Sequence, residues 1–370
     1  MIEGGDGVKK IKVLMIGNHQ SVKGGITSVI QQLLSFDWDS VGVEMKFIPT
    51  YIEASGIKKI AYFIRAYMNI EKEMRRNKPD IVHIHMSYRG SFYRKYAIHK
   101  LCKKYGVPDV IHLHGSEFQK WYNESDDRTK EKIRTLLRES ASFIVLGEKW
   151  NKAIHDIEPK TKTVVVSNTV PIPNYTTSWN EKRFQFLFLG VLIKRKGVAD
   201  LIQAISLLKK EGSLNNIKFV IAGSGAEEAN LKQQARELQV ESWIEFAGWT
   251  DGKAKERYLK DSQALVLPSY NEGLPMAVLE AISYGLPVIA TDVGDMAAAV
   301  RDGENGYLIH PGDVEAIADA ILKVSNKNQY DRFSKFSKEL AITKFNEDGF
   351  FEQILRSEER RVGKECRTRC

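Results

Sequence analysis

Two glutamates that are separated by seven residues, Glu272 and Glu280, are the side chains of this sequence best placed for chemistry. Glu272 lies in a loop after the apolar run Ala264–Leu267, and Glu280 lies about a turn and a half into the helix expected from Pro275. Carboxylates accept hydrogen bonds from neighbouring hydroxyls, such as those of a sugar or a ribose. In the simpler interpretation, Glu272 caps the helix and Glu280 is an exposed helix residue. The surrounding order of strand, glycine, proline and helix instead favours ligand binding by both carboxylates.

The start of this helix is a predicted anion site. Gly273 lets the backbone approach a ligand closely. Pro275 is expected as the first helical residue, a position where its missing N–H costs nothing. Because the first amides of a helix have no partner within it, they bind anions, and a diphosphate suits this site.

A group of cations, Lys194-Arg195-Lys196, lies between the predicted strand Phe186–Gly190 and the predicted helix Gly197–Lys210. Positive charge at this position neutralises charge that develops on a departing nucleoside diphosphate. The alternative is an ordinary basic loop in a basic protein.

Glycines mark further turns after predicted strands. Gly24-Gly25, before the helical stretch Ile26–Leu34, permits close approach of backbone to phosphate, although the sequence matches neither a dinucleotide fingerprint nor a P-loop. Gly223 follows the strand Phe219–Ala222, and Thr250 follows the turn at Gly248. Both turns suit a nucleotide site, and both are also common in simple architecture.

Histidines occur in pairs on two predicted strands, as His83 with His85 and His112 with His114. His114 comes at the carboxyl end of its strand, which suits a position in a ligand site, whereas His112 is expected in the core. Because no carboxylate completes a recognisable ligand set, the sequence does not favour a metal site.

Buried strands alternate with helical stretches along the chain, which predicts α/β architecture with parallel sheets. A polar segment with two prolines, Pro171–Ser178, interrupts this pattern before it starts again. We therefore expect a Rossmann-like domain over residues 1–173 and a second over residues 174–345, with a ligand cleft between the carboxyl edges of their sheets. Residues 346–370 would hold a helix end and, from Arg356 to Cys370, a non-native tail.

Composition narrows the class of protein and its partners. The chain has 370 residues, no run of about 18 apolar residues and no apolar leader at its start, so a cytoplasmic protein is expected. Cys102, Cys366 and Cys370 are expected as free thiols.

Positive charge is concentrated between Gly56 and Tyr105, within a net formal charge of +8. This half of the first domain suits an anionic partner such as a phosphorylated acceptor or a membrane surface. A solvated basic face is the alternative. Nucleic acid is not expected as a partner, because no recognition or stacking module is present.

Taken together, these motifs resemble family 4 of the retaining glycosyltransferases, whose GT-B fold has two Rossmann-like parallel-sheet domains facing across a cleft. The resemblance covers roughly Lys12 to Phe350, and it is most specific over Pro268–Asp292. Asp302–Gly306 and Pro311–Asp313 also look like later loops of that family.

The resemblance implies roles for the matching positions. Glu280 would bind the ribose of the donor nucleotide, and Glu272 the hydroxyls of the donor sugar. Lys196, with Arg195 beside it, would hold the diphosphate, and His114 would lie near the transferred sugar. Backbone at the glycine turns and the helix start would complete the donor site, at Gly24, Gly25, Gly223, Thr250, Gly273, Leu274 and Pro275.

The same resemblance implies a donor that is a nucleoside-diphosphate sugar, expected to be UDP-linked, with no metal and no other cofactor. The motifs do not identify the acceptor. From the basic region, especially residues 94–105, we expect an enzyme that is cytoplasmic or peripheral on the inner face of an anionic membrane, with a cell-envelope, exopolysaccharide or lipid-linked glycan as acceptor. Two positions depart from the family pattern: Val191 stands where an Arg is frequent, and Gly294-Asp295-Met296-Ala297-Ala298 replaces a Gly-Gly-x-Pro-Glu loop.

Two other functions are compatible with the same fold. A UDP-sugar epimerase would form product without any acceptor. A non-catalytic nucleotide-sugar-binding subunit would bind UDP without turnover, and the presence of Lys196, Glu272 and Glu280 argues against it.

Overall fold

The computed structural model describes residues 10–347 and 349–354, so the tail Arg356–Cys370, with two of the three cysteines, lies outside the described residues. The chain forms two compact units, which are Met1–Val166 with Phe351–Cys370 (unit 1) and Ser167–Phe350 (unit 2). The division between them falls at Val166/Ser167, ahead of the proline segment. That segment lies against unit 2, where Lys338 Nζ donates to the carbonyls of Pro173 and Tyr175 at 2.7 and 2.9 Å.

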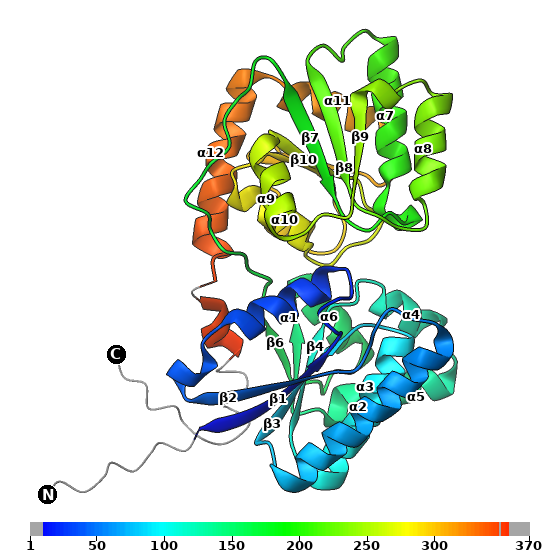
Figure 1. Ribbon diagram of the computed structural model, residues 1–370, viewed down its shortest axis with the longest axis vertical. Coiled ribbons are helices and arrows are strands. Elements are labelled where there is room, and N and C mark those ends of the chain that lie inside the picture. Colours follow the sequence, from blue (N-terminus) through cyan, green and yellow to red (C-terminus); the bar gives the residue numbers. More distant parts are fainter. Residues whose placement is uncertain (1–9, 348, 355–370) are drawn as a thin grey trace, which may run out of the picture. The chain divides into compact units, whose positions relative to one another are not determined.

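Unit 1 is built on a parallel sheet of six strands in the order β2-β1-β3-β4-β5-β6 (Figure 1). The strands are β1 (Ile11–Gly17), β2 (Val43–Pro49), β3 (Ile81–Met86), β4 (Asp109–Leu113), β5 (Ser142–Val145) and β6 (Thr163–Val165). The helices are α1 (Gly25–Ser35), α2 (Gly56–Arg76), α3 (Gly90–Tyr105), α4 (Phe118–Glu124), α5 (Asp127–Glu139) and α6 (Glu148–Ile157), with a 3-10 turn at Trp38–Val41.

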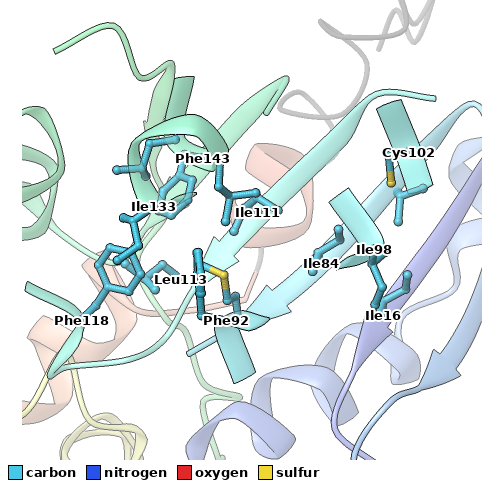
Figure 2. Close-up of a cluster of buried hydrophobic side chains, with 14 of the residues drawn as sticks. Ile16, Ile84, Phe92, Ile98, Cys102, Ile111, Leu113, Phe118, Ile133 and Phe143 are labelled. Atoms are coloured by element: carbon cyan, nitrogen blue, oxygen red, sulfur yellow. The ribbon is translucent and has the colours of Figure 1, made fainter. Parts of the chain in front are cut away.

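Alternate strand residues of unit 1 point to opposite faces of the sheet. Ile84 and Ile111 join a large apolar core with side chains from α3 and α5, among them Phe92 and Ile133 (Figure 2). The histidines of β3 and β4 lie at the alternate positions, and His85 therefore points to the other face. Its Cβ lies near the Gly17 position, next to Ile30 of α1.

Unit 2 holds a second parallel sheet of six strands, in the order β12-β11-β10-β7-β8-β9. The strands are β7 (Phe184–Leu189), β8 (Ile217–Ala222), β9 (Ile244–Gly248), β10 (Ala264–Leu267), β11 (Val288–Thr291) and β12 (Gly306–Ile309). The helices are α7 (Val198–Lys210), α8 (Glu228–Glu237), α9 (Gly252–Asp261), α10 (Met276–Ser283), α11 (Val314–Val324) and α12 (Lys327–Lys344), with 3-10 turns η2 (Lys194–Lys196), η3 (Glu241–Trp243) and η4 (Met296–Ala298).

The layers of unit 2 follow from its connections. Helices α7 and α11 pack together, and α10 packs on α12, so helices cover both faces of the sheet (Figure 1). Because all strands run parallel, the loops after β7, β8, β9, β10 and β11 emerge at one edge. This edge gathers the glycines and charged residues that the sequence singled out in unit 2.

The predicted α/β fold with two parallel sheets is confirmed. Strands β2 and β12 were not predicted, and both lie at the edges of their sheets. For β2, the reason is its burial pattern. This strand is mostly exposed or half-buried along its length, so it lacks the apolar run that marks the central strands. Among the described residues, no helix combines the length and the apolar character needed to cross a membrane.

Candidate active site

The loop between β10 and α10 holds four of the predicted site residues, Glu272, Gly273, Leu274 and Pro275. Pro275 lies directly before the helix, with φ −74° and ψ 130°, and the first helical residue is Met276. The expectation that Pro275 is itself the first helical residue is therefore off by one position, because its extended ψ makes it the cap. No described side chain caps this end of α10, so its first amides face the edge of the sheet without a side-chain acceptor.

Leu274 and Gly273 are held from both sides by hydrogen bonds. The Leu274 carbonyl accepts from Asn168 Nδ2 at 2.8 Å, and the Gly273 carbonyl accepts from the Asp295 amide at 3.0 Å. Gly294 has φ 57°, and a Cβ there would overlap the Glu272 carbonyl oxygen. The loop that departs from the family pattern thus packs directly on the backbone of the predicted sugar site, which fixes its position.

Lys196 and Glu272 form an ion pair with Nζ and Oε1 2.5 Å apart. Their side chains are 14% and 8% exposed, so the pair is largely shielded from water. The sequence placed both residues in one site but did not predict that they touch. A shielded lysine beside a carboxylate is a fixed positive charge whose partner a ligand phosphate can replace.

Turn η2 brings Lys196 to this position. Gly197 ends the turn with φ 68°, and a Cβ there would overlap the carbonyl oxygen of Pro268. Arg195 binds the next loop twice, since its carbonyl accepts from the Tyr270 amide and its Nη1 donates to the Asn271 carbonyl, both at 2.8 Å. Arg195 therefore joins the η2 and β10 loops, whereas Lys196 carries the charge toward Glu272.

Glu280 has a partner that the sequence did not reveal. Lys255 of α9 places its Nζ 2.6 Å from Glu280 Oε1, in a partly buried pair. No local motif around Lys255 indicates this contact, because it depends on how α9 and α10 pack. The two predicted hydroxyl-binding carboxylates thus each have one lysine in the described structure.

Glycine turns after β8 close the site tightly. A Cβ at Gly223 would overlap the Gly190 carbonyl oxygen, and one at Gly225 would overlap the Leu192 carbonyl oxygen. Only glycine allows the β7 and β8 loops to approach this closely. After β9, Thr250 is half-buried, and its Oγ1 is buried with no hydrogen-bond partner among the described residues. Such a hydroxyl is suited to a ligand.

In unit 1, the predicted residues lie at the carboxyl ends of β1 and β4. Gly24 has φ 131° and precedes α1, which begins at Gly25. His114 directly follows β4, and its amide donates to the Met86 carbonyl at 2.9 Å. The described structure brings Lys196, Glu272, Glu280 and the helix start together within unit 2, and it brings His114 together with other histidines in unit 1.

Four histidines pack on one another across β3 and β4. His85 Nδ1 lies 2.9 Å from His114 Nε2, and His83 Nε2 lies 3.3 Å from His112 Nδ1. Burial, followed by the neighbouring imidazoles, lowers the pKa of His85 and His112 well below the usual value, and burial lowers the pKa of His114 to about 3. We call these four residues the histidine cluster, and within it the imidazoles of His85, His112 and His114 are neutral at physiological pH.

The histidine cluster is also where a cation is best accommodated in geometric terms. Donor nitrogens of His83, His85 and His112 all lie within 4.8 Å of one another, and neutral imidazole is the form that binds metals. No carboxylate belongs to this group. Two pairwise contacts join its nitrogens, and Nε2 of His85 and Nε2 of His112 are buried with no hydrogen-bond partner among the described residues.

Two family models match consecutive parts of the chain. Residues 40–172 match the model for Glycosyltransferase Family 4, and residues 176–340 match the model for Glycosyl transferases group 1. Together they cover about four-fifths of the chain.

Individual proteins are similar over most of their length. The UDP-Gal:alpha-D-GlcNAc-diphosphoundecaprenol alpha-1,3-galactosyltransferase of Escherichia coli is 26% identical over 328 residues, which are 84% of this chain and 82% of that protein. Sucrose-phosphate synthase from Thermosynechococcus elongatus superposes with a TM-score of 0.80 at 16% identity, covering 95% and 99% of the two chains. The Anabaena protein HepE, solved in complex with UDP-glucose, gives 0.74 at 15% identity, covering 95% and 100%.

The fold and the matched models define a glycosyltransferase with the GT-B fold. Within that class, the chain belongs to glycosyltransferase family 4. It is therefore an enzyme that transfers a sugar, and the predicted family membership is confirmed.

Proposed function

We propose that this enzyme is a retaining glycosyltransferase that moves a sugar from a UDP-sugar to a hydroxyl of a lipid-linked or cell-envelope glycan. The observation that carries the proposal is the arrangement around the start of α10. Lys196 pairs with Glu272 on one side of the helix start, and Glu280 lies further along the same helix. A nucleoside diphosphate sugar offers three matching groups in the same order: the sugar, the diphosphate and the ribose.

In the proposed complex, the ribose, the diphosphate and the sugar of the donor each contact a complementary group of unit 2. Glu280 accepts hydrogen bonds from the ribose hydroxyls, after its lysine partner turns aside. The free amides at the start of α10, with Gly273 and Leu274 before it, hold phosphate oxygens. Glu272 binds hydroxyls of the sugar, and Gly223 and Thr250 border the nucleotide.

Lys196 acts on the leaving group. The bond between the anomeric carbon and the phosphate oxygen breaks, and its electron pair leaves with the nucleoside diphosphate. The charge that develops on the β-phosphate attracts the Lys196 ammonium away from Glu272, and Arg195 keeps the two loops in register. Preorganised groups of this kind are worth about 3 kcal/mol each in the transition state. The proposed reaction requires no metal ion.

The acceptor hydroxyl attacks the anomeric carbon on the face that the diphosphate leaves. A new bond forms between the acceptor oxygen and that carbon, and the hydroxyl proton passes to the departing phosphate. Configuration is therefore retained. We assign His114 to the transferred sugar and Gly24-Gly25 to the diphosphate, as the family resemblance implies. Because His114 is neutral, it donates or accepts a hydrogen bond there without adding charge.

The lipid-linked acceptor is supported by one relative. The E. coli galactosyltransferase is named for an acceptor that carries a diphosphoundecaprenol group. The basic half of unit 1 is chemically suited to an acceptor of this kind, since diphosphate groups are anionic.

A screen of nucleotide sugars tests the proposal. Purified enzyme is incubated with each donor, and the release of nucleoside diphosphate and the thermal shift are measured with and without an undecaprenyl-diphosphate sugar. We expect UDP-sugars alone to stabilise the enzyme, and release to rise with the acceptor. Product from donor alone with an altered sugar would identify an epimerase, and binding of UDP without turnover would identify a non-catalytic subunit.

A further inference from the structure

The histidine cluster occupies aligned positions on two neighbouring strands. His83 and His85 lie two residues apart on β3, and His112 lies on β4 two residues before His114. In the register of these parallel strands, His85 is paired with His112. Because alternate residues of a strand point to the same side, the imidazoles gather on one face of the sheet. The side chains of His83, His85 and His112 are exposed by 0, 2 and 0%, so three imidazoles are enclosed together.

Contacts within the cluster leave two ring nitrogens without a partner. His85 Nδ1 lies 2.9 Å from His114 Nε2, and His112 Nδ1 lies 3.3 Å from His83 Nε2. The other nitrogen of His85 and of His112, Nε2 in both, is buried with no hydrogen-bond partner among the described residues. Buried polar atoms of this kind are rare in folded proteins, and ion binding is one of their explanations. The two contacts therefore hold the rings while one nitrogen of each ring is available.

The protonation state of these rings suits a metal. Imidazole binds metal ions through a nitrogen lone pair, which only the neutral form offers. Burial, followed by the neighbouring imidazoles, lowers the pKa of His85 and His112 well below the usual value. When the proton of a neutral ring is on Nδ1, Nε2 carries the lone pair. Histidines that ligate metals commonly donate a hydrogen bond from their other nitrogen, because this bond fixes the ring.

The spacing of the three enclosed imidazoles is close to that of a ligand set. One donor nitrogen each from His83, His85 and His112 lie within 4.8 Å of one another. Ligand nitrogens on a tetrahedral zinc ion are about 3.4 Å apart, because each bond is near 2.0–2.1 Å. The rings therefore have to approach by roughly 1.4 Å at most, which side-chain rotation can supply. The group contains no oxygen ligand of the kind that Mg²⁺ and Ca²⁺ require.

We propose that His83, His85 and His112 bind a transition-metal ion of the zinc type, which links β3 to β4. Three neutral imidazoles form one of the ligand sets of zinc, and imidazole favours zinc, copper or nickel over the oxygen-binding cations. The fourth position of a tetrahedral ion is left to a further ligand. The ion is part of the framework of unit 1 and takes no part in the bond changes of sugar transfer.

An ion at this site would act on the sugar site through His85. The Nδ1 of His85 contacts His114 Nε2 at 2.9 Å, and the two rings stack with their centroids 5.1 Å apart. Fixing His85 therefore fixes the side chain on which His114 rests. This consequence rests on the proposed function, in which His114 contacts the transferred sugar, whereas the metal site itself does not.

Titration with zinc tests the proposal. The full chain is purified without a histidine tag, dialysed against EDTA and then against buffer, and titrated with Zn²⁺ in the calorimeter. We expect one ion per chain with a Kd below about 1 µM. His85→Phe and His112→Phe should each bind about a hundredfold more weakly or worse, because each removes a ligand. His114→Phe should weaken binding only about tenfold, because it removes the hydrogen-bond partner of a ligand.

The matched control removes two exposed histidines of the described chain. His19→Ala/His310→Ala should bind zinc as tightly as the native enzyme. Equal losses in this control and in the cluster variants would overturn the proposal, because surface histidines would then hold the ion. A native enzyme that binds no zinc, or binds it with a Kd above about 100 µM, would overturn it directly.

X-ray absorption at the zinc edge of the native enzyme gives an answer that depends on no variant, should a cluster variant fail to fold. We expect a nitrogen shell near about 2.0 Å with the scattering pattern of imidazole rings. A sulfur shell near about 2.3 Å would place the ion on cysteines and would overturn the histidine cluster as its site.

Kinetics separate the metal site from the proposed function. Removal of zinc should lower kcat without abolishing it and leave KM for the donor unchanged, because only the support of His114 is lost. A change in KM alone would contradict the link to His114. Zinc binding without sugar transfer contradicts only the proposed function, and transfer by a native enzyme that binds no zinc contradicts only the metal site.

Discussion

The two sheets present opposite kinds of chemistry at their carboxyl edges. In unit 2, charge is arranged in pairs, with Lys196 on Glu272 and Lys255 on Glu280. In unit 1, His85, His112 and His114 of the histidine cluster are neutral because burial lowers the pKa of their imidazoles. The difference teaches that one parallel-sheet plan can hold a group of paired charges or a group of uncharged side chains, depending on a few residues near the ends of its strands.

The ion pairs of unit 2 have a specific consequence. Glu272 and Glu280 each pair with a lysine, so unit 2 itself holds these two carboxylates in place. The neutral histidines need no counter-charge, and they pack against each other instead. We expect the first arrangement to respond to an incoming anion and the second not to respond.

Removing the positive charge of Lys196 in unit 2 should have the largest effect, which is a loss of activity. Lys196→Ala is expected to lower kcat by roughly a hundredfold, since it removes one preorganised cation from the leaving group. Steady-state kinetics with a saturating UDP-sugar measure it. Lys194→Ala, in the same turn but exposed, should change kcat little. Equal losses in both variants, or none in Lys196→Ala, would show that the Lys196–Glu272 pair is not the catalytic part of the site.

Adding a side chain at Gly223, in the turn after β8, should have the next largest effect, which is a loss of stability. Gly223→Ala puts a Cβ into the Gly190 carbonyl oxygen, which should lower the free energy of unfolding by about 2–3 kcal/mol. Gly212→Ala is the matched control: it has φ 70° and no atom within 4 Å of its Cβ position, so about 1 kcal/mol is expected. Urea unfolding of both variants decides whether contact or backbone conformation dominates; a smaller loss for Gly223→Ala would contradict the close approach of the loops.

Substituting Glu280, the second of the two carboxylates, should separate an effect on donor binding from an effect on catalysis. Glu280→Gln weakens hydrogen bonds to the ribose, and we expect KM for the donor to rise about tenfold while kcat changes little. Lys255→Met frees Glu280 from its partner and should leave KM equal or lower, because the carboxylate no longer has to leave a lysine. A large fall in kcat for Glu280→Gln would instead place this residue close to the reacting atoms.

Acid should weaken unit 1 more than unit 2. His114 has a pKa of about 3 when folded and an ordinary value near 6.5 when unfolded, so the unfolded chain binds the proton first as pH falls. Stability contributed by the neutral state is therefore complete above about pH 6.5 and is lost as pH falls toward 3, by up to about 1.4 kcal/mol per pH unit for each such histidine.

Hydrogen exchange measures this difference within one molecule. Between about pH 7 and about pH 5, opening free energies of β4 should fall, while those of β8 in unit 2 serve as the internal reference. His85→Phe/His112→Phe should flatten the dependence in β4. Parallel changes in both strands would mean that the histidine cluster does not control the acid response.

The features that could be predicted from the sequence are those that depend on local residue patterns. The strand and helix alternation gave the two parallel sheets, and the Gly273–Pro275 context placed the start of α10 to within one residue. Contacts between distant segments could not be predicted. Lys255 meets Glu280, and Asn168 meets the Leu274 carbonyl, only because helices and loops pack in three dimensions. The exposure of Ile57, Ile60, Ile64 and Met68 on α2 also could not be predicted, since the same aliphatic spacing is typical of a core-facing helix.

A hydrogen-exchange footprint of UDP tests the central claim most directly, because it asks which of the two edges binds the nucleotide. The account predicts that saturating UDP slows exchange at residues 190–197 and 268–283 of unit 2, and that the Lys196→Ala and Glu280→Gln variants need more UDP for the same protection. Protection confined to β3 and β4 of unit 1, with unit 2 unchanged, would contradict it.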